Sequence, residues 1–132
     1  MPKDGNHTKP TILLVEDEKD LAHVVSEILS TLPAQVVVAR TGREAIRMIE
    51  SGQTFDLVLL DLVLPQINGL EVLRRLRRTS TSTKVIFSTG YASALNADDF
   101  DKLKISGLLG KPYLPGELLA AVRAALWPSV ND

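Results

Sequence analysis

Several charged or polar side chains come directly after apolar segments of this 132-residue chain, where they could support chemistry. They are Glu16, Asp17, Asp61, Thr89 and Lys111. Each one alone would be an ordinary solvated loop residue, but all of them together form a pattern. Carboxylates placed close together repel an anion unless a divalent cation takes up their charge. Mg²⁺ prefers such hard oxygen ligands, so the residue types indicate a divalent-cation site.

The elements that would position these side chains follow from the hydrophobic pattern. Short apolar runs alternate with segments of helical period, which is typical of repeating β–α units. We predict strands over 11–16, 35–39, 55–60, 84–88 and 105–109, and helices over about 19–32, 41–51, 69–78, 93–102 and 115–127. Strands that are apolar on both sides favour a parallel sheet with helices on both faces. The expected fold class is α/β, a three-layer doubly wound sandwich with the candidate residues at its carboxyl edge.

Composition limits the classes of function. The chain has room for one domain, and 15 Lys and Arg against 16 Asp and Glu give a charge of −1, so no general attraction to nucleic acid or to a membrane is implied. The absence of cysteine excludes disulfides and thiolate metal sites. Residues 1–10 lack the apolar core of a signal peptide, and no apolar run is long enough for a membrane span. We expect a cytoplasmic protein with a flexible N-terminal segment at 1–10 and a tail at 128–132.

Four stretches carry a family resemblance: "VEDE" at 15–18, "LLDLVLPQINGLEVL" at 59–73, "STGYAS" at 88–93 and "GKPY" at 110–113. In this order and at this spacing, residues 11–127 resemble the receiver domain of two-component response regulators, of the chemotaxis-regulator type. The resemblance implies a flavodoxin-like, five-stranded parallel sheet of order 2-1-3-4-5. It also implies a signalling domain, not an enzyme beyond self-phosphorylation and autodephosphorylation. Such a domain takes a phosphoryl group from a histidine kinase or phosphotransfer protein and relays its state to an output protein that the sequence does not identify.

The resemblance also assigns roles to individual residues. Asp61 would be the phosphoacceptor, with Thr89 and Lys111 as its catalytic partners. Mg²⁺ (or Mn²⁺) would be bound by Glu16 through water, and directly by Asp17, Asp61 and the backbone carbonyl of Val63. The Lys111–Pro112 peptide bond is expected to be cis.

Other features leave the output open. Leu108 stands where well-studied receivers carry Tyr or Phe as a rotating switch. The fifth helix is apolar around most of its circumference, which favours a partner or a homodimer through the face of helix four, strand five and helix five. The chain is expected to be either a free-standing receiver or a piece of a hybrid kinase or larger regulator.

Specific residues disfavour three alternative functions. A phosphatase with an aspartyl-phosphate intermediate needs an acidic residue two positions after its nucleophile, where this chain has Val63. A flavodoxin-like cofactor site needs a loop rich in Ser, Thr or Gly after the first strand, and the acidic residues there disfavour a phosphate. The run Arg74–Arg78 is interpreted as a solvated helical face, so no direct contact with nucleic acid is expected.

Overall fold

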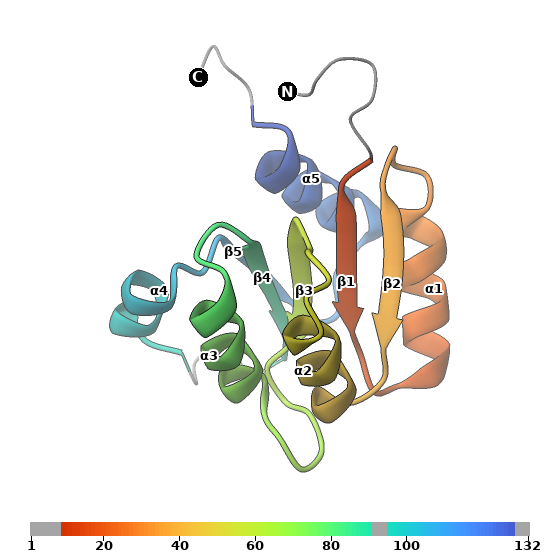
Figure 1. The fold of residues 1–132 in the computed structure, drawn as a ribbon. Helices are drawn as coiled ribbons and strands as arrows, with labels where there is room; N and C mark the ends of the chain where they lie inside the picture. Colours follow the sequence, from red (N-terminus) through yellow and green to blue (C-terminus); the bar gives the residue numbers. More distant parts are fainter. Residues whose placement is uncertain (1–8, 91–94, 129–132) are drawn as a thin grey trace.

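The computed structural model describes residues 9–90 and 95–128, which alternate between strands and helices (Figure 1). The strands are β1 (Thr11–Val15), β2 (Gln35–Ala39), β3 (Leu57–Asp61), β4 (Lys84–Thr89) and β5 (Gly107–Gly110). The helices are α1 (Lys19–Leu29), α2 (Gly42–Glu50), α3 (Gly69–Thr79), α4 (Ala97–Leu103) and α5 (Pro115–Leu126). The expected flexible segment 1–10 and the tail 128–132 lie mostly outside the described residues, and so does Tyr91 of the "STGYAS" motif.

The five strands form one parallel sheet in the order β2-β1-β3-β4-β5, which confirms the predicted topology. Alternate residues of each strand face opposite sides of the sheet, so β1 contributes Leu13 to one core and Ile12 to the other. Helices α2, α3 and α4 cover the first core, and α1 and α5 cover the second (Figure 1). The strands are therefore apolar on both sides, and their polar residues fall at their ends.

Some boundaries differ from the sequence prediction. Helix α1 ends at Leu29 instead of 32, because the hydroxyls of Ser30 and Thr31 donate to the carbonyls of Glu27 and Ile28 and turn the chain. Strands β3 and β5 both begin two residues later than predicted, and β3 extends to Asp61. Helix α4 begins at 97, because residues 96 and 99 form a capping box there. These shifts leave the order of the elements unchanged.

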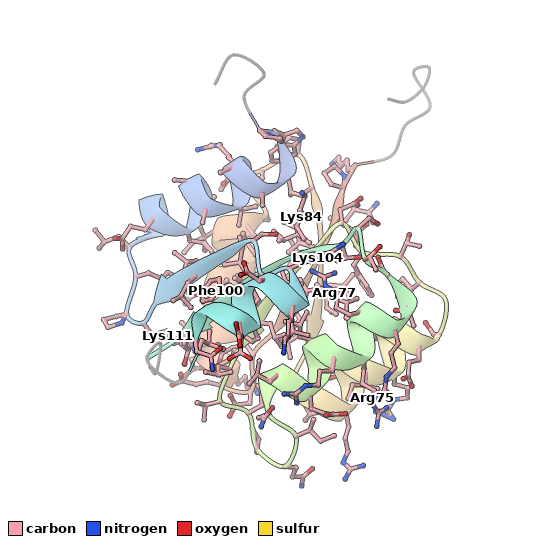
Figure 2. The ribbon with its side chains drawn as sticks, turned by 90° about the vertical axis from the view of Figure 1, so that its left-hand side faces the viewer. Arg75, Arg77, Lys84, Phe100, Lys104 and Lys111 are labelled. Atoms are coloured by element: carbon pink, nitrogen blue, oxygen red, sulfur yellow. The ribbon has the colours of Figure 1, made fainter. Side chains whose placement is uncertain are left out.

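Helix α4 packs on the first core through Phe100 and Leu103, and Arg77 of α3 adds a polar link to it (Figure 2). The Arg77 guanidinium donates to four backbone carbonyls, at 2.8–3.2 Å, belonging to Ser80, Thr83, Leu103 and Lys104. Two of these carbonyls lie at the C-terminal end of α4, and two lie in the segment between α3 and β4. Burial lowers the pKa of Arg77 from its ordinary value. A single cation thus links three segments through their backbone.

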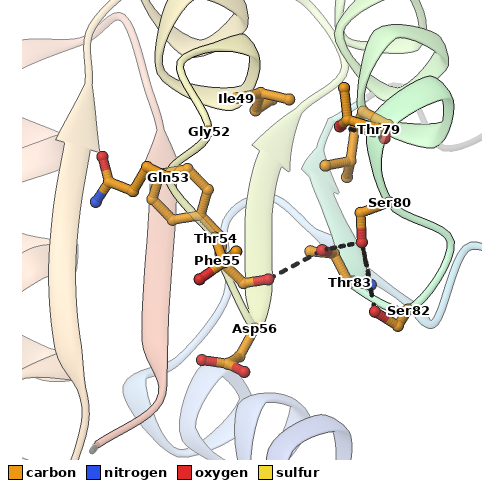
Figure 3. Close-up of a pocket in the computed structure, with 11 residues that line it drawn as sticks. Ile49, Gly52, Gln53, Thr54, Phe55, Asp56, Thr79, Ser80, Ser82 and Thr83 are labelled. Atoms are coloured by element: carbon orange, nitrogen blue, oxygen red, sulfur yellow. Dashed lines mark hydrogen bonds between the residues drawn. The ribbon is translucent and has the colours of Figure 1, made fainter.

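A cavity of about 240 Å³ lies at the amino edge of the sheet, opposite the carboxyl ends of the strands (Figure 3). Its polar lining consists of hydroxyls together with Gln53 and Asp56. The Thr83 hydroxyl lies 2.8 Å from the Ser80 hydroxyl and donates to the Phe55 carbonyl at 2.9 Å. These hydrogen bonds satisfy the Thr83 and Ser80 hydroxyls. None of the helices in the described residues combines the length and apolar character needed to cross a membrane.

Candidate functional site

An acidic cluster lies at the carboxyl edge of the sheet. Strand β3 is the neighbour of β1, with Val15 paired to Leu60, so the residues that follow in the two strands, Glu16 and Asp61, come side by side. Carboxylate oxygens of Glu16, Asp17 and Asp61 all lie within 4.8 Å of one another. Glu16 and Asp61 are buried, with 3% and 7% of their surface exposed, whereas Asp17 is exposed. The structure therefore brings together the three carboxylates that the sequence singled out.

Lys111 neutralises part of this cluster. It follows β5, and its ammonium group lies 2.9 Å from Glu16 Oε1 and 2.9 Å from Asp61 Oδ2. Burial alone would lower the pKa of Lys111, but hydrogen bonds to the two carboxylates and their negative charge outweigh it, so the pKa is raised. Lys111 therefore remains charged at neutral pH. The Lys111–Pro112 peptide bond is cis, as the family resemblance implies.

The Asp61 carboxylate is held by a donor on each oxygen. Its Oδ1 accepts from the backbone N–H of Val63 at 3.0 Å, and its Oδ2 accepts from Lys111. The loop after Asp61 packs so closely against the strand that a Cβ at Gly69 would collide with the Asp61 carbonyl oxygen. Glycine is the residue that permits this approach. The loop geometry and the Val63 N–H together fix the orientation of the candidate phosphoacceptor.

Thr89 ends β4, the strand on the other side of β3. Ser88 pairs with Asp61 in the sheet, so Thr89 lies one position further toward the carboxyl edge. Thr89 is buried, and its carbonyl accepts from the backbone N–H of Lys111 at 2.9 Å. Burial is the main cause of a raised pKa at Tyr113. The candidate site residues thus come from four neighbouring strands, β1, β3, β4 and β5, at one edge of the sheet.

Arg40 is a residue of this edge that the sequence analysis missed. It follows β2, and its Nη2 donates to the backbone carbonyl of Asp17 at 2.9 Å. The strand-end pattern that found Glu16, Asp61 and Lys111 applies equally to β2, but the sequence analysis did not extend it to that strand. The signal was therefore present in the sequence.

The cluster has the chemistry that a divalent cation requires. Three carboxylates and one ammonium group leave a formal charge of −3 + 1 = −2. Within the described residues, the Asp17 carboxylate has no hydrogen-bond or ion-pair partner, so its oxygens are available. Hard oxygen ligands with one exposed carboxylate fit Mg²⁺, which keeps several waters and takes one or two carboxylates. The residues present therefore fit the metal that the family resemblance implies.

Comparisons with known proteins identify the family of this chain. The family model described as "Response regulator receiver domain" matches residues 12–123. The chain is 40% identical over 125 residues to the uncharacterized transcriptional regulatory protein YkoG of Bacillus subtilis, covering 89% of this chain and 51% of that protein. It is 36% identical over 115 residues to the transcriptional regulatory protein CpxR of Escherichia coli, covering 87% and 48%. The chain thus spans about half the length of the curated relatives that it matches.

Solved structures show the same fold. A CheY-like response regulator receiver domain from Methanospirillum hungatei matches with a TM-score of 0.83 and 29% identity, over 90% of this chain and 94% of that one. The receiver domain of a putative Luxo repressor protein from Vibrio parahaemolyticus matches with a TM-score of 0.80 and 31% identity, over 89% and 90%. With the family match over most of its length, this chain belongs to the response regulator receiver domain family of two-component signal transduction.

Proposed function

We propose that this chain accepts a phosphoryl group on Asp61 from a histidine kinase or phosphotransfer protein and relays that state to an output protein. The observation that carries the proposal is the Asp61 carboxylate itself. It lies at the rim of the sheet inside an acidic cluster, with the Val63 N–H on one oxygen and the Lys111 ammonium on the other. A carboxylate in such a position can act as the nucleophile toward a phosphoryl group.

Phosphoryl transfer depends mainly on positioning and on stabilising charge at the phosphoryl oxygens. An Asp61 oxygen forms the new bond to phosphorus while the bond from phosphorus to the donor nitrogen breaks. Lys111, which contacts Asp61 beforehand, is close enough to move its hydrogen bonds to the phosphoryl oxygens. By the family resemblance, we propose that the Thr89 hydroxyl also stabilises charge on the phosphoryl oxygens. The loop held by Gly69 keeps the Asp61 backbone in place during transfer.

The same residues would bind the cation. Asp17, Asp61 and the backbone carbonyl of Val63 are proposed as direct ligands of Mg²⁺ or Mn²⁺, with Glu16 acting through water. When bound, the cation supplies positive charge that offsets the repulsion between the carboxylates and an incoming phosphoryl group. Lys111 contacts Glu16 and Asp61 but not Asp17, which leaves the exposed side of the cluster open to the ion.

We further propose that residues 11–127 form the receiver domain and that the protein works in the cytoplasm. Its output face would consist of α4, β5 and α5. Leu108 on β5 has 37% of its surface exposed and lines a groove with Ala121 and Ala125 of α5. A homodimer through this face is part of the proposal. Leu108 has less surface to bury than an aromatic ring. We therefore expect phosphorylation of Asp61 to change the output face only weakly through Leu108.

The test of the proposed function is intact-mass measurement after incubation with acetyl phosphate and Mg²⁺. The wild-type protein should gain one phosphoryl group, and Asp61→Asn should gain none while keeping its circular dichroism spectrum. The matched control is Asp20→Asn, an exposed carboxylate on α1, which should be labelled like the wild type. Labelling of Asp61→Asn to the wild-type extent would refute the assignment of the phosphoacceptor.

A further inference from the structure

Arg40 lies beside the acidic cluster because β2 is the sheet neighbour of β1. Val15 pairs with Ala39, and the Glu16 N–H donates to the Ala39 carbonyl at 3.1 Å, so the β1–β2 pairing continues into the acidic segment. The residue after Ala39 is Arg40, and the residue after Glu16 is Asp17. The sheet register therefore places the arginine next to the loop that carries the exposed carboxylate.

The backbone of Arg40 is held at the start of α2, and its guanidinium group reaches the loop that carries Asp17. The Arg40 backbone N–H donates to Glu44 Oε1 at 2.7 Å, and the Glu44 N–H donates to the Thr41 hydroxyl at 3.0 Å, at the start of α2. The Glu44 side chain thus holds the Arg40 backbone one residue before Thr41, the N-cap of α2. From this base, Arg40 Nη2 donates to the Asp17 carbonyl at 2.9 Å.

The loop that carries Asp17 has few other restraints. The N-cap of α1, Glu18, accepts no side-chain capping bond, and its own N–H donates to Glu16 Oε2 at 3.2 Å. The Asp17 side chain itself binds nothing within the described residues. The Arg40 hydrogen bond is therefore the contact that holds the Asp17 backbone carbonyl, and through it the direction of the carboxylate.

The guanidinium is aimed at the backbone and not at the carboxylates. No ion pair joins Arg40 to any acidic side chain of the described residues, although three carboxylates lie nearby. Its Nε is buried without a hydrogen-bond partner. A buried donor without a partner is unfavourable, so the side chain keeps this conformation despite a local cost. A residue that only neutralised the cluster would be expected to contact a carboxylate oxygen.

We propose that Arg40 is a positioning residue, which holds Asp17 at the cation site by binding its backbone carbonyl. The inference rests on the proposed function, since it concerns the same acidic cluster. It adds a residue from the strand that the sequence analysis did not connect with the site. Residues that orient a metal ligand from outside typically change metal affinity strongly when they are replaced.

The test separates positioning from simple electrostatics, because the two predict opposite signs. Removal of a positive charge near the cluster strengthens cation binding if Arg40 acts only through its charge. If Arg40 positions Asp17, Arg40→Met should weaken Mg²⁺ binding, roughly tenfold by analogy with other outer ligand contacts. Arg40→Lys keeps the charge but lacks the planar fork, so it should also weaken binding. The control is Arg43→Met, an exposed arginine three residues further along the chain.

Mg²⁺ affinity is measured by isothermal titration calorimetry on the wild type and the three variants. Amide hydrogen exchange at Asp17 and Glu18 without metal gives a second readout, and it should be faster in Arg40→Lys than in wild type. In an Asp17→Asn background, Arg40→Lys should cause little further loss of affinity, because its effect passes through Asp17. Circular dichroism checks that each variant is folded. If Arg40→Met does not fold, the conservative Arg40→Lys variant still tests the inference.

The outcomes distinguish this inference from the proposed function. If the wild type binds Mg²⁺ and both Arg40 variants bind it as well as Arg43→Met does, or more tightly, the positioning role is wrong while the cation site stands. If the wild type does not bind Mg²⁺, the cation site itself is wrong, and the role of Arg40 falls with it.

Discussion

Replacement of Lys111 with methionine should destabilise the protein, because it leaves the acidic cluster without the ammonium group that contacts it. The formal charge of Glu16, Asp17, Asp61 and Lys111 changes from −2 to −3. Glu16 and Asp61 are nearly buried and would both lose a hydrogen bond of 2.9 Å. Carboxylates in this position recover only part of their hydration unless the strand ends move.

The contacts of Lys111 set the magnitude of this effect. A hydrogen bond to a charged group contributes about 1.5–3 kcal/mol, and removal of one partner of a buried ion pair costs about 3–5 kcal/mol. The cluster lies at the rim of the sheet, and the Lys111 side chain is 22% exposed, so water can reach part of it. We therefore expect Lys111→Met to lower the free energy of unfolding by about 2–4 kcal/mol in the absence of divalent cations.

Urea denaturation at neutral pH in the presence of a chelator measures this change. The control, Lys84→Met, replaces an exposed lysine of β4 and should change the free energy of unfolding by no more than about 0.5 kcal/mol. Addition of Glu16→Gln to Lys111→Met should recover part of the loss, because one uncompensated carboxylate is removed. Mg²⁺ should stabilise Lys111→Met more than the wild type. If Lys111→Met is as stable as Lys84→Met in chelator, the account of the cluster is wrong.

The pH dependence of the difference follows from the raised pKa of Lys111. The stabilisation is fully present below the ordinary lysine pKa of 10.5 and is lost as pH rises through the higher pKa of the folded state. The difference in stability between wild type and Lys111→Met should therefore shrink at strongly alkaline pH. Burial raises the pKa of Tyr113 as well, and the charge of Lys111 opposes that rise, so ionisation of Tyr113 does not cancel in the difference between the two proteins and the comparison is made in a Tyr113→Phe background.

Two further pairs of variants test the packing that supports the site. Gly69→Ala should destabilise the protein by at least about 2 kcal/mol, because its Cβ would meet the Asp61 carbonyl. Its control, Gly116→Ala in α5, has open space around the new Cβ and should be neutral or stabilising by up to about 1 kcal/mol. Equal midpoints of urea unfolding for the two variants would contradict this. Arg77→Gln should cost about 2–4 kcal/mol and speed hydrogen exchange in α4, whereas Arg78→Gln on the exposed side of α3 should change stability by less than about 0.5 kcal/mol. Similar exchange in both Arg variants would show that Arg77 does not anchor α4.

Much of the fold could be predicted from the sequence, because its signal is local. Strands that are buried on both faces must be apolar along their whole length, and β3 is buried at every position. The polar residues that end such strands, Glu16 and Asp61 among them, are therefore visible as interruptions of the pattern. The strand order came from the family resemblance, since periodicity does not encode which strands are neighbours. Element ends were less accurate, because side chains such as Ser30 and Thr31 decide them through individual hydrogen bonds.

The sequence by itself determined the fold class and the set of carboxylates, lysine and threonine at one edge of the sheet. Only the tertiary structure decided how these groups contact one another: that Lys111 bridges Glu16 and Asp61 across 95 and 50 positions of the chain, and that Arg40 binds the Asp17 backbone. Such contacts depend on sheet register and on the reach of long side chains, to within a few tenths of an ångström. Neither quantity leaves a trace in the local pattern of residues, because the two partners of each contact come together only when the sheet has formed.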